Sequence, residues 1–193
     1  MIIENYDTYG LDDCLITPVA AKSIKSIEQF VGNIIRKSKD DKWCYVDFTP
    51  LSPPNNLEVW NHARSYLINQ RLQCWVRIDY TGYRNRYKSC FPNVNIDKMV
   101  IDHILNRRFA KVFGFNYVRL VHLDKSVNSS SGAGMEYDVI NYKNPDGLSK
   151  FKESSEEVYY ADPSDLIKIL NMKVGAFPLD NVRDNSYLFY GKR

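Results

Sequence analysis

The stretch from residue 80 to residue 88, YTGYRNRYK, interleaves three tyrosines with three cations. Cationic side chains neutralise phosphates and aromatic rings stack on bases, so this alternation is typical of a nucleic-acid-binding surface. We expect the stretch to form a loop, and the alternative interpretation is that this loop is only solvated or binds an acidic protein. With further cations later in the chain, the predicted nucleic-acid-binding residues are Tyr80, Tyr83, Arg84, Arg86, Tyr87, Lys88, Arg107, Arg108, Lys111 and Arg119.

Three aspartates, Asp47, Asp79 and Asp124, each stand near the end of an apolar run. Carboxylates brought together can hold Mg²⁺, which supports phosphoryl chemistry. Alternatively, each aspartate caps a turn. Because no clear nucleophile or phosphate-binding lysine accompanies them, we predict no catalytic residue, no metal and no cofactor. Catalysis with Mg²⁺, using these aspartates and His122, is the alternative; His122 is otherwise a core residue.

The stretch from Asn128 to Gly134, NSSSGAG, follows an apolar run and reads as a polar loop. Its backbone N–H groups and hydroxyls would suit a phosphate. It has neither the Gly-Lys-Ser/Thr of a P-loop nor the glycine spacing of a dinucleotide-binding turn. We therefore predict at most a weak phosphate site, and a solvated connection is the alternative. Its residues are Ser129, Ser130, Ser131 and Gly132.

The charge distribution is uneven along the chain. The net charge is +3, but residues 82–125 are rich in Lys and Arg, whereas residues 1–20 and 135–165 are mainly acidic. A basic middle between acidic flanks favours a polyanionic partner and, at the ends, docking on other protein subunits. His62 and His103 are expected on helix surfaces.

Composition points to an intracellular protein without a membrane partner. Hydrophobic residues make up 44% of the 193 residues and charged residues 25%, which is ordinary for a globular chain. No apolar run reaches the roughly 18–20 residues of a membrane span. The four cysteines form no C-x-x-C pair, and Cys44 and Cys74, each beside a tryptophan, are interpreted as buried thiols in a reducing compartment.

The elements that must position these residues alternate between helix and strand. Apolar spacing predicts helices over 22–37, 56–71 and 96–113, the last stopped by Gly114 in a left-handed conformation. Buried strands are predicted over 43–49, 74–80 and 116–123. Because crossovers this long favour parallel strands, we predict an α/β fold, a three-layer or two-layer sandwich with a mainly parallel sheet. Ligands of such sheets bind at the carboxyl ends of the strands, where the three aspartates and the tyrosine-rich stretch would meet.

The predicted organisation is an α/β domain over 1–142 followed by residues 143–193. The second part consists of a polar linker, a short helix over 162–170 and an extended C-terminal tail that packs on the same domain. From these patterns we predict a non-catalytic protein that associates with nucleic acid, preferably RNA, as a component of a ribonucleoprotein or viral assembly. The alternatives are a small Mg²⁺-dependent nuclease or phosphotransferase and a structural subunit of a protein assembly.

Overall fold

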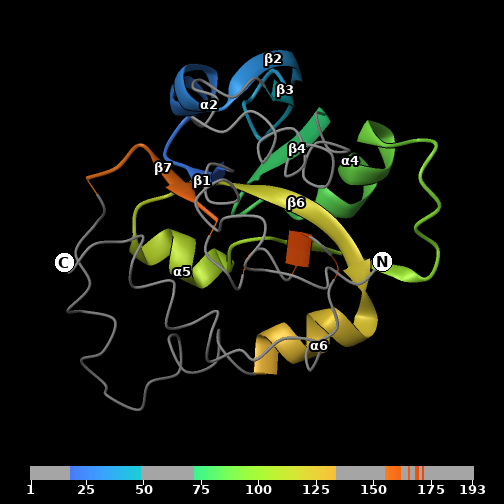
Figure 1. The fold of residues 1–193 in the computed structure, drawn as a ribbon. Coiled ribbons are helices and arrows are strands. Elements are labelled where there is room, and N and C mark those ends of the chain that lie inside the picture. The colour runs from blue at the N-terminus through green and yellow to red at the C-terminus, as the bar shows by residue number, and fades with distance from the viewer. Residues whose placement is uncertain are drawn as a thin grey trace, which may run out of the picture.

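The computed structural model describes residues 18–48, 72–133, 155–161, 165, 168, 169 and 171 (Figure 1). Its strands are β1 (Pro18–Ala21), β2 (Gly32–Lys37), β3 (Trp43–Phe48), β4 (Leu72–Arg77), β5 (Met99–His103), β6 (Tyr117–Asp124) and β7 (Val158–Tyr160). Its helices are α2 (Ile24–Phe30), α4 (Tyr83–Cys90), α5 (Arg107–Val112) and α6 (Lys125–Ala133).

The described strands form one curled antiparallel sheet, open like half a barrel. Their order is β2-β3-β4-β6-β1-β7, and β5 pairs with β6 outside this path. Each described pairing is antiparallel. The prediction of an α/β sandwich with a mainly parallel sheet is therefore wrong. Neighbouring carboxyl ends do not meet at one edge of an antiparallel sheet, so the argument that placed a site there fails as well.

The predicted helix over 22–37 divides into a short helix and a strand. The hydroxyl of Ser23 accepts the backbone N–H of Ser26 at 3.0 Å and caps α2, which ends at Phe30. In β2 the side chain of Ile34 packs inward, whereas that of Ile35 is 59% exposed. Neighbouring isoleucines on opposite faces show the twofold period of a strand. A hairpin then joins β2 to β3, where a helix leading into the first strand was predicted.

The predicted helix over 96–113 also divides. Residues 99–103 form β5, which pairs with β6, and Ile101 and His103 face the interior. α5 starts after Asn106, whose side-chain oxygen accepts the N–H of Arg108 at 2.8 Å. Gly114, with φ of 80°, follows this helix as predicted. The apolar residues of the 96–113 segment fit both the helical and the strand periodicity. Residues 99–103 form a strand because they pair with β6.

The two polar stretches expected to be loops are helical. Tyr83–Cys90 forms α4, and Lys125–Ala133 forms α6. The strands predicted over 43–49 and 116–123 are confirmed to within a residue, and the one over 74–80 is found at 72–77.

Several predictions lie outside the described residues: the helix over 56–71, most of the helix over 162–170 and the C-terminal tail. The domain boundary after residue 142 stays a prediction. Among the described helices none has the length and apolar character needed to cross a bilayer.

Successive side chains of the central strands point to opposite faces of the sheet, so apolar side chains are buried on both faces. In β3, Trp43 and Tyr45 join the larger cluster, whereas Cys44 and Val46 join the smaller one. The smaller cluster lies under α2 and includes Trp75. The larger cluster includes residues of α4, α5, β5 and β6. The larger cluster anchors α4 and α5 on the same side of the sheet.

Candidate nucleic-acid interface

The start of α4 places an aromatic ring and a cation together at the surface. Tyr83 is half-buried, and its ring centroid lies 4.6 Å from that of His103. The guanidinium carbon of Arg84 lies 4.9 Å from the Tyr83 ring centroid, within cation–π range, and Arg84 is exposed. The helix starts after Gly82, where a side chain would meet the Tyr80 hydroxyl at 2.6 Å. The first turn of α4 thus presents a ring flanked by a positive charge.

The start of α5 presents a second group of cations. Asn106 caps the helix, so Arg107 and Arg108 occupy its first turn, and both are exposed. A guanidinium nitrogen of Arg107 lies 3.5 Å from the carbonyl oxygen of Ile78. Neither arginine forms an ion pair with another described residue. Lys111 is exposed one turn further on.

These two groups, separate in the sequence, meet at one cavity of about 220 Å³. Its lining comes from the first turns of α4 and α5, from the end of β5 and from Lys168. The lining residues are Tyr83, Asp102, His103, Asn106, Arg107, Arg108 and Lys168. Three of these seven residues, Tyr83, Arg107 and Arg108, belong to the predicted nucleic-acid-binding surface.

The wall of the cavity includes a buried lysine that the sequence reasoning missed. The ammonium of Lys168 donates to the carbonyl oxygens of His103 at 3.3 Å and Ile104 at 3.1 Å. It also lies 3.3 Å from a carboxylate oxygen of Asp102. The only available clue was a lysine inside the apolar run LIKIL, since a charge in such a run needs partners when it is buried. These contacts hold the Lys168 ammonium against the end of β5.

His103 is buried beside this lysine, and its expected place on a helix surface is wrong. The residue is 5% exposed, and its Nε2 has no hydrogen-bond partner among the described residues. Burial lowers the pKa of His103 to about 4, against the opposing effect of Asp102, and Arg107 and Lys168 lower the pKa further. The imidazole is therefore neutral at neutral pH. His103 lies in β5, where it pairs with Leu120 of β6, and its place depends on this long-range pairing.

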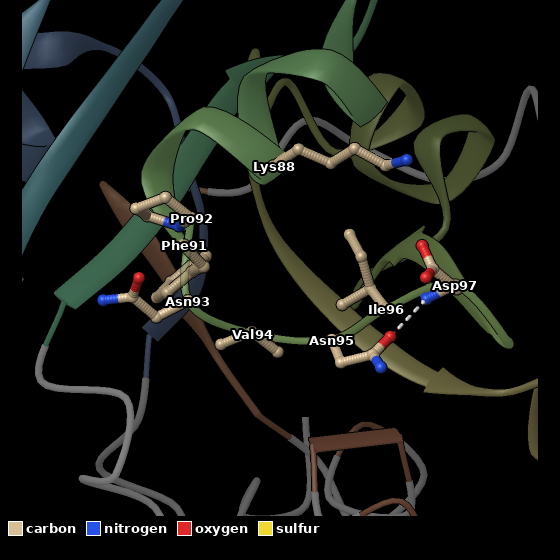
Figure 2. A pocket seen from close by; sticks show the side chains of 8 residues that line it. All are labelled: Lys88, Phe91, Pro92, Asn93, Val94, Asn95, Ile96 and Asp97. Carbon is tan, nitrogen blue, oxygen red and sulfur yellow. Dashed lines mark hydrogen bonds between the residues drawn. The ribbon is translucent and has the colours of Figure 1, made fainter.

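A second cavity, of about 320 Å³, lies beyond the other end of α4. Figure 2 shows Lys88 extending from the last turn of the helix, with Asn95 and Asp97 on the loop below. The backbone N–H of Asp97 donates to the side-chain oxygen of Asn95 at 3.2 Å. Val94, which also lines the cavity, is 37% exposed. Apolar and amide groups side by side suit an unstacked base, so α4 has a usable hollow at each end.

Some predicted contact residues are buried or half-buried in the structure. Tyr87 is 1% exposed, and its hydroxyl lies 2.7 Å from Nδ1 of His122. His122 is half-buried and has a hydrogen-bond partner within the fold.

Two predicted cations are likewise turned towards the interior. The guanidinium of Arg86 lies 4.1 Å from the ring centroid of Trp43. Arg119 is fully buried opposite Trp75 on the neighbouring strand, and burial lowers its pKa to about 10. Tyr80 is half-buried and packs on the larger apolar cluster. Arg119 is thus enclosed by the fold, whereas Arg86 and Tyr80 are half-buried.

The three aspartates do not converge in the described structure. Asp47 pairs with Leu72 at one end of the β3–β4 ladder, whereas Asp79 follows the opposite end. Asp79 accepts both hydrogen bonds of a fork from Arg77, at 2.9 and 3.1 Å. Asp124 is engaged by Asn171, whose amide nitrogen lies 3.2 Å from its carboxylate. No group of three or more metal-binding side chains occurs within the described ranges.

The predicted phosphate loop is part of α6. The hydroxyl of Ser129 donates to the carbonyl oxygen of Lys125 at 2.9 Å, a bond back along the helix. The side chains of Ser130 and Ser131 lie outside the described residues, and Gly132 has no side chain. A helix consumes its backbone N–H groups internally, so the mid-helix position removes the backbone donors on which this site depended.

Comparison of the chain with protein-family models, with curated protein sequences and with solved structures found no match.

Proposed function

We propose that this protein binds single-stranded nucleic acid, with RNA as its natural ligand, and carries out no reaction on it. One observation supports this proposal above all: Tyr83 of α4, with Arg84 beside its ring, lines a single cavity together with Arg107 and Arg108 of α5. Exposed arginines contact phosphates, and a half-buried tyrosine presents a face on which a base stacks. RNA is favoured because its single-stranded loops and ends present unstacked bases.

The second cavity extends the same surface. Tyr83 and Lys88 stand at the two ends of α4, about 7–8 Å apart along the helix axis at 1.5 Å per residue. A strand lying along α4 would therefore reach both hollows.

The proposal includes an intracellular location and membership of a ribonucleoprotein or viral assembly. Cys44, Cys74 and Cys90 are buried free thiols, which suits a reducing compartment.

The test is a titration of fluorescently labelled single-stranded RNA, followed by anisotropy at several salt concentrations. Arg107→Ala/Arg108→Ala removes two charges from the surface. Lys25→Ala/Lys39→Ala removes two exposed charges from α2 and the β2–β3 hairpin and is the matched control. Because each single-strand phosphate contact contributes about 0.7 to the slope of log affinity against log salt, the arginine variant should flatten the slope by about 1.4.

The control variant should keep the slope of the unmodified protein. Binding should also weaken for every RNA sequence, since phosphate contacts carry no sequence information. Equal losses in both double variants would show that net charge matters and that this surface does not. Binding that is insensitive to salt would overturn the proposal.

A further inference from the structure

We propose that the cavity between α4 and α5 binds a phosphate monoester, the terminal phosphate of a nucleic-acid strand. This inference rests on the proposed function and makes it more specific. It concerns which part of the strand the cavity takes, whereas the surface around it would contact any internal phosphate.

The size of the cavity fits a phosphate group rather than a whole nucleotide. At about 220 Å³ it is smaller than the about 300–1,000 Å³ typical of sites for drug-sized molecules. A nucleotide therefore does not enter as a whole, but its phosphate does. The base next to that phosphate would remain outside, level with the exposed part of Tyr83.

The walls of the cavity favour a phosphate at the end of a nucleic-acid strand over an internal phosphate. They come from four separate parts of the chain: Tyr83 of α4, Asp102 and His103 of β5, the start of α5 and, beyond residue 160, Lys168. An internal phosphodiester is joined to a nucleotide on each side, so it needs a groove that is open at both ends. A terminal phosphate has one exit and fits a hollow that is enclosed on several sides.

The charges lining the cavity suit a dianion. Arg107, Arg108 and Lys168 supply three positive charges, and the carboxylate of Asp102 supplies one negative charge, so the lining carries a net charge of +2. Lys168 is already engaged by Asp102 at 3.3 Å, which leaves the two arginines to face the ligand. A terminal phosphate carries a charge of about −1.5 to −2 at neutral pH, whereas an internal phosphate carries only −1.

His103 adds a neutral polar group beside these cations. It lines the cavity and is buried, and its Nε2 has no hydrogen-bond partner among the described residues. A buried imidazole nitrogen without a partner is costly, and a phosphate oxygen nearby would supply one. Bound phosphate would also raise the pKa of His103, because a nearby negative charge favours the protonated ring.

The experiment compares short RNAs of one sequence that carry a 5′-hydroxyl, a 5′-phosphate or a 3′-phosphate. The two phosphorylated forms separate the two possible sources of the monoester. At least one should bind about tenfold more tightly than the form without a terminal phosphate, as expected for one added charge-assisted contact. Arg107→Ala should remove this gain. Lys111→Ala removes a charge from the same helix outside the cavity and should retain it.

A second measurement tests the cavity without a strand. Adenosine 5′-monophosphate should shift the side-chain NMR resonances of His103, and adenosine should not. If all three RNAs bind equally and the monophosphate leaves His103 unchanged, the inference is overturned while the proposed function stands. If the monophosphate shifts His103 but no RNA binds, the proposed function fails and the phosphate site remains. A gain that persists in Arg107→Ala would place the terminal phosphate elsewhere and overturn the inference.

Discussion

Acidification should destabilise the protein through His103. In the folded protein its pKa falls from 6.5 to about 4, chiefly because of burial. Asp102 opposes this shift, while Arg84, Arg107 and Lys168 support it. Between these two pKa values the unfolded chain binds a proton that the folded chain does not, so the free energy of unfolding falls as the pH falls through 6.5 and levels off near pH 4.

The size of the effect follows from the two pKa values. A pKa difference of about 2.5 corresponds to about 3 kcal/mol, of which about 2 kcal/mol is lost between about pH 7 and pH 5. Urea unfolding at these two pH values, followed by circular dichroism, measures the loss. The unmodified protein should lose about 2 kcal/mol more than His103→Gln, whose side chain does not titrate.

His122→Gln is the comparison variant for this experiment. Burial also lowers the pKa of His122, but His122 is less buried than His103 and its Nδ1 already has a partner in Tyr87. The variant should therefore keep most of the pH-dependent loss. If His103→Gln loses as much stability on acidification as the unmodified protein, the conclusion that His103 is buried in its neutral form is refuted.

Three further substitutions test the division between structural and binding residues. Tyr87→Phe removes the hydroxyl that lies 2.7 Å from His122 and should lower the free energy of unfolding in urea by about 1 kcal/mol without weakening RNA binding; weaker binding would contradict the buried position. Arg86→Ala removes the cation above Trp43 and should destabilise the protein by roughly 1 kcal/mol in thermal unfolding, with a smaller effect on RNA affinity than Arg108→Ala. Gly114→Ala forces a side chain into a left-handed conformation and should cost about 1 kcal/mol; an unchanged melting temperature would contradict that conformation.

The strands at the centre of the sheet were predictable because their composition leaves little choice. Trp43–Phe48 and Tyr117–Asp124 are short apolar runs rich in aromatic and β-branched residues, and both were found where expected. Their direction was not predictable. Parallel pairing was inferred from long crossovers between alternating helices and strands, but the segments 22–37 and 96–113 each contain a strand that pairs antiparallel with a neighbour.

The candidate site was predictable only where its residues are exposed. Arg107 and Arg108 were identified from charge alone, and the structure leaves both at the surface. His103 and Lys168 were missed because their burial depends on contacts between segments far apart in the sequence. Arg119 fails for the opposite reason: its charge suggested the surface, but β6 crosses the centre of the sheet and buries it completely. The local sequence shows which residues are charged, whereas contacts between distant segments determine which of them are exposed.

The decisive measurement is a map of backbone amide chemical shifts during titration with a short single-stranded RNA. We predict that the changes concentrate in α4, the end of β5 and α5, with residues 91–97 next. α2, which covers the opposite face of the sheet, should remain unchanged and serves as the internal reference. Shifts confined to α2 and β2, or none at saturating RNA, would contradict the assignment of the surface around Tyr83, Arg107 and Arg108 as the nucleic-acid interface.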